Sequence, residues 1–119
     1  MAVIPFVKHQ WNGDGDLYKV ETITAGDESS VLTFPEWQVD ISVHIYGTVG
    51  GSTITVQGSL VGSQFNVVDD AYGTAMSYTA LTNVLKPVGP ALSMLKIVST
   101  GGAGVDVDAD VKVVRKRQP

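Results

Sequence analysis

The most constraining feature of the sequence is a strict alternation of apolar and polar residues in two segments. In residues 38–46, valine or isoleucine occupies every second position, and mostly polar residues lie between them. Residues 105–113 alternate in the same way, with Asp106, Asp108 and Asp110 on the polar side. Successive side chains of a β-strand point to opposite faces, so both segments predict strands with one buried and one solvent-facing side.

Shorter runs rich in β-branched residues, bounded by turn residues, predict the remaining strands. They lie at 17–24, 31–34, 52–58, 64–68, 75–79, 82–85 and 92–99. The glycine-containing loop between the strand at 38–46 and the strand at 52–58 predicts a hairpin. Prolines 87 and 90 predict a loop at 86–90. No window shows the spacing and caps of a helix, so the fold class predicted is all-β: an antiparallel, jelly-roll-like β-sandwich of about eight short strands.

A chain of 119 residues is long enough to bury one hydrophobic core, and it contains no cysteine that could form a disulfide. The period of two in the strands predicts which side chains lie in the hydrophobic core. The predicted core consists of Val20, Val39, Ile41, Val43, Ile45, Ile54, Val56, Ile97, Val107, Ala109, Val111 and Val113.

The pattern divides the chain into three parts: an extended N-terminal arm at 1–16, a β-sandwich domain at 17–114 and a basic C-terminal tail at 115–119. The first residues lack the basic and apolar regions of a signal peptide, so none is expected. No apolar run approaches the roughly 20 residues of a membrane span, so no membrane partner is expected.

The distribution of charge argues against nucleic acid as a partner. The net charge is −4, but four of the eight basic residues lie in the last eight positions. The four basic and twelve acidic residues before position 112 give the body of the chain a net charge of −8. Because phosphate contacts require a basic surface, an acidic body of this kind is unsuited to nucleic acid.

One segment resembles the start of a calcium loop. Asn12, Asp14 and Asp16 have the spacing of the first three ligands, but Leu17 takes the place of the required glycine and Ile23 that of the bidentate glutamate. A turn rich in asparagine, aspartate and glycine explains the segment without metal.

Other combinations of reactive residues are incomplete as well. His9 and His44 are the two histidines, and no spacing joins them in a zinc site. Ser59 lies one position early for a nucleophile elbow, and no helix follows it. Asp69 and Asp70 are adjacent, so on a strand they would point apart. We therefore expect no catalytic residues, no cofactor and no metal, and we expect that the protein is not an enzyme.

Three segments carry a resemblance to a known family. They are TAGD at 24–27 leading to FPEWQVD at 34–40, YGTVGGSTITVQGS at 46–59 and STGGAGVDV at 99–107. Together they resemble the small β-sandwich virion proteins of tailed bacteriophages, in particular capsid decoration (cement) proteins, over about residues 20–114. The sequence departs from the family pattern at 60–65, where LVGSQF stands in place of an Asn-Asp-Gly turn followed by tryptophan.

The resemblance implies a structural virion protein that is made in the host cytoplasm and sits on the outer capsid surface. There it would stabilise the capsid by bridging neighbouring major capsid subunits, as a homotrimer. An apolar arm that reaches onto a neighbour and a basic tail would supply the contacts. The expected oligomer or capsid contact residues are Val3, Ile4, Phe6, Val7, Trp11, Trp37, Arg115, Lys116 and Arg117.

The aromatic residues leave an alternative open. Trp11 and Trp37 flank turns or prolines, where the core needs them less, and exposed aromatic rings are typical of sugar platforms. The alternative is a carbohydrate-binding β-sandwich module or a small tail or fibre component involved in host attachment.

Overall fold

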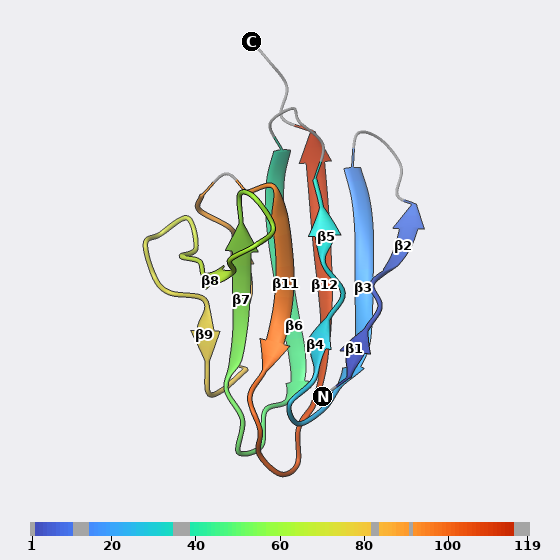
Figure 1. Ribbon diagram of the computed structural model, residues 1–119, viewed down its shortest axis with the longest axis vertical. Helices are drawn as coiled ribbons and strands as arrows, with labels where there is room; N and C mark the ends of the chain where they lie inside the picture. Colours follow the sequence, from blue (N-terminus) through green and yellow to red (C-terminus); the bar gives the residue numbers. More distant parts are fainter. Residues whose placement is uncertain (1, 11–14, 35–38, 82–83, 91, 116–119) are drawn as a thin grey trace.

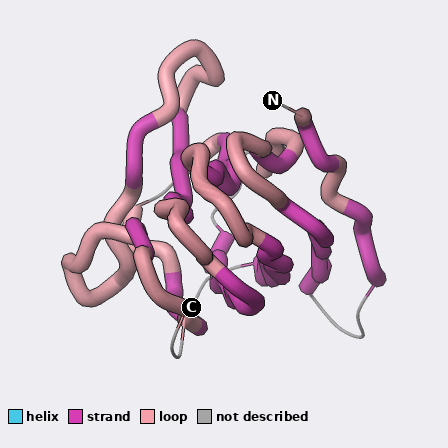
Figure 2. Tube along the Cα trace, turned by 90° about the horizontal axis from the view of Figure 1, so that it is seen from below, coloured by secondary structure: helices cyan, strands magenta, loops and turns pink. Residues whose placement is uncertain are grey.

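The computed structural model describes residues 2–10, 15–34, 39–81, 84–90 and 92–115. In this part of the chain, twelve strands form two sheets packed face to face, and no helix occurs (Figures 1 and 2). The predicted antiparallel β-sandwich is confirmed. The strands are β1 (Val3–Ile4), β2 (Val7–Gln10), β3 (Gly15–Ile23), β4 (Glu28–Ser29), β5 (Leu32–Thr33), β6 (Val39–Thr48), β7 (Ile54–Ser59), β8 (Asn66–Val67), β9 (Ser77–Tyr78), β10 (Leu85–Pro87), β11 (Met94–Ser99) and β12 (Asp106–Arg115).

The two sheets differ in regularity. The five-stranded sheet has the order β10-β6-β12-β3-β2, and all of its pairs are antiparallel. The seven-stranded sheet follows the path β1-β4-β11-β7-β8, with β5 also paired to β11 and β9 also paired to β7. Only the β1–β4 pair is parallel among the described strands. The long strands therefore lie mainly in one sheet, and the other is completed by two-residue strands.

The predicted core is confirmed for every member whose side chain the structure describes; the side chain of Val39 lies outside that set. Each of these residues is at most 8% exposed. Except for Val105, which begins the alternating segment 105–113, the further core residues lie outside the two strictly alternating segments, where periodicity gives a weaker signal. They are Ile23, Leu32, Phe34, Val49, Val68, Met76, Val84, Leu95 and Val105.

The hairpin expected between 38–46 and 52–58 is wrong. Strand β6 pairs with β10 and β12, whereas β7 pairs with β8, β9 and β11 in the other sheet. The loop between β6 and β7 therefore crosses from one sheet to the other. The loop between β11 and β12 makes the same crossing, because these strands also lie in different sheets.

The two crossing loops pack against each other, and glycine makes this contact possible. Gly51 N–H donates to the Ala103 carbonyl at 3.1 Å, and the buried Ser52 hydroxyl lies 2.9 Å from that of Ser99. Gly50 has φ +59°, and a Cβ there would lie 2.3 Å from the Ala103 carbonyl oxygen. Any larger residue would separate the loops, which explains why both carry glycine runs.

The segment 1–16, expected to be an extended N-terminal arm, contributes strands to the sandwich. It contributes β1 to the edge of one sheet, β2 to the edge of the other and the first two residues of β3. Hydrogen bonds hold it in place: Glu28 N–H donates to the Ala2 carbonyl, and Phe6 N–H donates to Ser30 Oγ at 2.9 Å. The same short segment therefore closes one side of both sheets.

The loop expected at 86–90 begins later than predicted, because Pro87 is the last residue of β10. This strand is the edge of the five-stranded sheet, beside β6. Proline has no N–H to donate to a neighbouring strand, but it is tolerated on an edge strand. Pro87 therefore excludes only a central strand at this position.

Replacing Ile97 with alanine should lower the free energy of unfolding by about 2–5 kcal/mol, because the side chain is fully buried and its removal leaves a cavity. Val98→Ala is the matched control, since its half-buried side chain points to the opposite face of β11; it should cost less than about 1.5 kcal/mol. Denaturant unfolding measures both. Equal losses would contradict the assigned faces of this strand.

Candidate functional site

The predicted contact residues of the N-terminal segment separate into two groups. Val3 and Val7 are 58% and 55% exposed, whereas Ile4 and Phe6 are partly buried against the core. Trp11, Trp37, Lys116 and Arg117, with the side chain of Arg115, lie outside the described residues. Two of the expected residues are thus available to a partner, and two contribute to the chain's own core.

A buried carboxylate fixes the start of this segment. Asp27 accepts hydrogen bonds from the hydroxyl and the N–H of Thr24, at 2.7 and 3.1 Å, and from Ala2 N–H at 3.1 Å. The Thr24 hydroxyl, followed by the Thr24 and Ala2 N–H groups, lowers the pKa of the Asp27 carboxyl. Each donor favours the charged form, so the ionised aspartate connects the N-terminal segment to the turn before β4.

The outer face of the five-stranded sheet carries the aspartate row of β12. Asp110 lies 3.8 Å from Lys19 Nζ, and its carboxylate accepts a long hydrogen bond of 3.4 Å from the Tyr46 hydroxyl. Burial, followed by the charges of Asp110 and Asp108, raises the pKa of Tyr46. The Tyr46 ring lies 4.9 Å from that of the exposed His44. This polar face therefore carries two neighbouring rings, His44 and Tyr46, with the Asp110 carboxylate beside the Tyr46 hydroxyl.

A β-bulge at one end of this face explains the position of Asp108. Thr22 has φ +62°, an unusual and strained value for a β-branched residue. Glu21 and Thr22 together oppose the single residue Asp108 of β12, and the Asp108 carboxylate accepts the Thr22 N–H at 2.8 Å. Asp108 therefore has a structural role, beyond the solvated face that the alternation predicts.

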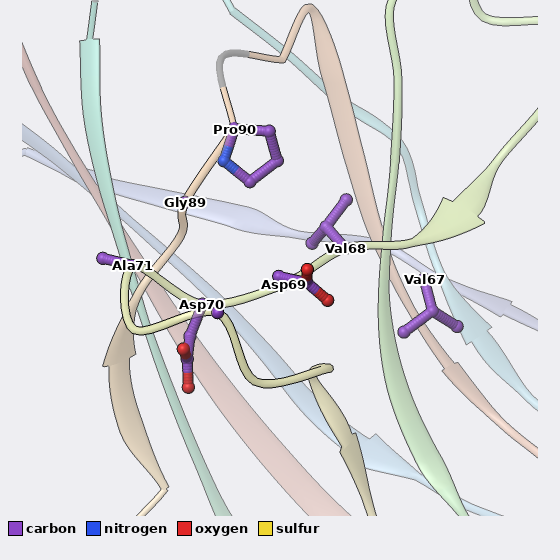
Figure 3. Close-up of a pocket in the computed structure, with 8 residues that line it drawn as sticks. Val67, Val68, Asp69, Asp70, Ala71, Gly89 and Pro90 are labelled. Carbon is purple, nitrogen blue, oxygen red and sulfur yellow. The ribbon is translucent and has the colours of Figure 1, made fainter.

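A second feature is a shallow hollow of about 500 Å³ between the loop that precedes β9 and the loop after β10 (Figure 3). The Asp70 carboxylate accepts the N–H groups of Tyr72 and Thr74, at 2.8 and 3.1 Å, so it serves the turn. The neighbouring Asp69 is exposed, whereas Asp70 is buried. The lining residues are Val67, Val68, Asp69, Asp70, Ala71, Gly73, Gly89 and Pro90.

The histidines cannot share a metal ion. His9 is on β2 and His44 on β6, and β3 and β12 lie between these strands. Three strand spacings amount to about 14 Å. Within the described ranges, no group of three histidine or acidic residues is placed to hold a metal ion. Asn12 and Asp14 of the calcium-like segment fall outside those ranges.

The structure also shows an apolar turn that sequence analysis did not identify as a contact site. Leu60 and Val61, between β7 and β8, are 69% and 77% exposed. Ser59, which imitates a nucleophile elbow in the sequence, is 5% exposed, and its hydroxyl accepts the N–H groups of Val61 and Gly62. Its role in the structure is to shape this turn. The available signal was a serine followed three residues later by glycine, which is typical of a side-chain-capped turn.

Comparison with solved structures shows a similarity of fold. No protein-family model matches the sequence, and no curated protein matches it. The crystal structure of the SPBc2 prophage-derived protein YomS is similar to this chain, with a TM-score of 0.58 and 12% sequence identity. The similarity covers 89% of this chain and 99% of YomS, so the two share a fold along nearly their whole lengths. No helix of the described chain is long and apolar enough to span a membrane.

Replacing Asp27 with asparagine should lower the melting temperature at neutral pH, because the charged acceptor of three hydrogen bonds is lost. The depressed pKa means that this stabilisation is present above the ordinary aspartate pKa of about 3.9 and is lost as pH falls through the lower folded value. Thermal unfolding of both proteins from pH 7 to pH 3 should show the difference shrinking at the acid end. A constant difference would refute the ionic role.

Removing the Tyr78 hydroxyl should not destabilise the protein, in contrast to the loss of the Asp27 carboxylate. It is buried and has no hydrogen-bond partner among the described residues, and burial followed by the charge of Asp70 raises the pKa of Tyr78. Tyr78→Phe should therefore leave the free energy of unfolding unchanged or raise it by about 1 kcal/mol. Tyr46→Phe, the control, removes a hydroxyl that does have a partner and should cost up to about 1 kcal/mol. A larger loss for Tyr78→Phe than for Tyr46→Phe would contradict this assignment.

Proposed function

We propose that this chain is a structural protein of a tailed-phage particle, which decorates the outer capsid as a trimer and stabilises it by bridging neighbouring major capsid subunits. The observation that carries the proposal is the fold shared with a prophage-derived protein over nearly the full length of both chains. The resemblance of three turn-and-strand segments to capsid decoration proteins points in the same direction.

The surface supports a role in assembly. Val3, Val7, Leu60 and Val61 are each more than half exposed, and all lie at sheet edges or in a turn next to one. Aliphatic side chains in such positions gain free energy when a protein partner removes them from water. Binding to a lattice would also stabilise the folded state by mass action, in a chain that has no disulfide.

A specific observation favours a second candidate, a carbohydrate-binding module or small tail component for host attachment. The neighbouring rings of His44 and Tyr46, with the Asp110 carboxylate beside them, occupy an open sheet face. Aromatic rings next to carboxylates are suited to stack on a sugar and accept its hydroxyl hydrogens.

Particles of the phage that encodes this chain provide the test. Mass spectrometry of purified particles should detect the protein in a constant ratio to the major capsid protein, and gold-labelled antibody should mark the heads. Particles stripped of the protein should lose their contents at a lower temperature, and adding the protein back should restore them. Absence from the particles would refute the proposal. Label confined to tails, with glycan binding that His44→Ala abolishes, would favour the second candidate.

A further inference from the structure

The apolar turn, residues 59–62, projects two adjacent aliphatic side chains into solvent. Leu60 is 69% exposed and Val61 is 77% exposed. Neither side chain contributes to the core of its own chain. Single exposed apolar residues are common on protein surfaces, but two adjacent ones at the tip of one turn form a compact apolar projection.

This turn is built to hold its shape. The Ser59 hydroxyl is buried in the turn and accepts Val61 N–H at 3.3 Å and Gly62 N–H at 2.8 Å. Gly62 has φ +82°, and a Cβ there would lie 2.8 Å from Met94 Sδ, so the chain rests closely on β11. A turn ordered before binding loses little conformational entropy when a partner captures it.

The same chain carries a hollow of complementary character. It has a volume of about 180 Å³ and lies where the N-terminal segment passes from β1 to β2. Ile4, Pro5 and Val7 form its apolar part. The remaining lining residues, His9, Lys19 and Glu21, are polar, and an apolar contact bordered by polar residues is typical of protein interfaces.

The turn and the hollow lie on opposite sides of the sandwich. Met94 alternates with the buried Leu95, so the turn that rests on it covers the outer face of the seven-stranded sheet. Val7 pairs with Lys19, which is beside Asp110 on the outer face of the five-stranded sheet. Strands β7 and β8 are on the left of Figure 1, and β1 and β2 are on the right. One interface therefore cannot contain both features of the same copy.

We propose that the apolar turn of one copy inserts into the N-terminal hollow of the next copy. A contact between two different surfaces is head-to-tail, and it closes into a ring when the rotation between copies allows. The proposal deepens the trimer of the proposed function, on which it rests, by naming the contact that joins the three copies. The charged rim of Lys19 and Glu21 stays in water, while the aliphatic side chains are buried.

Two variants and their mixture test this contact. Leu60→Asp with Val61→Asp removes the turn's apolar surface, and Val7→Asp places a charge in the hollow next to its cross-strand neighbour Lys19. Sedimentation velocity should show a trimer for the original protein and a weakening of association by at least about tenfold for each variant. Mixed together, the two variants should form a one-to-one dimer and nothing larger, because one intact turn and one intact hollow remain.

Leu85→Asp is the matched control. Leu85 is 64% exposed on β10, at the edge of the five-stranded sheet opposite β2, and it belongs to neither the turn nor the lining of the hollow, so this variant should associate like the original protein. Circular dichroism must show all variants folded. A protein that is monomeric at every concentration, a turn variant that associates normally, or a mixture that forms no dimer would overturn the inference. Detection on phage heads is independent of these results, so failure of this contact and failure of the proposed function are distinguishable.

Discussion

The pairing of β6 with β12 is the constraint on which the rest of the molecule depends. Their register runs without interruption from Asp106 opposite Thr48 to Arg115 opposite Val39. A shift of one residue would move every inward valine and isoleucine to the solvent face and bury the aspartate row. Because both strands alternate strictly, any register that is offset by an odd number of residues would expose the apolar side chains of one strand. The core and the charged outer face are thus two consequences of the same pairing.

Alternation gives the bounds and the inward faces of the long strands, whereas the short strands are predicted only in part. The β-branched runs at 31–34, 64–68 and 75–79 contain β5, β8 and β9, but no strand is predicted where β1, β2 and β4 lie. The segment 105–113 and β12 (Asp106–Arg115) differ by two residues at most at either end. Strands β1, β4, β5, β8 and β9 have two residues each, which is too short for any period to show. The false hairpin has a related cause. A glycine-containing loop between two alternating runs suits a hairpin and a crossing between sheets equally well. In the structure the loop packs on the distant loop at 100–104, a partner that the local sequence does not indicate.

The composition of the N-terminal segment predicts that its apolar residues need burial, but it does not predict which of them are buried within the chain. Four apolar residues near the start suggest an arm that reaches a neighbour, because a free apolar segment is costly in water. In the structure, the four side chains differ in how much of their apolar surface is removed from water. Ile4 and Phe6 gain burial within the chain itself, and only Val3 and Val7 stay exposed. Which residues face inward depends on hydrogen bonds to Ser30 and Asp27, and nothing in the local pattern of the segment indicates those partners.

The position of the N-terminal hollow connects assembly to folding. Because β1 and β2 close one edge of each sheet, the segment between them has fewer neighbours to hold it than any central strand. The hollow is formed by this same segment, so it exists only when both edge strands are in place. A ligand that binds the closed edge stabilises it by mass action, whatever the ligand's own chemistry. An apolar turn from another copy would therefore do more than join two molecules, because it would also stabilise a segment that forms an edge of both sheets.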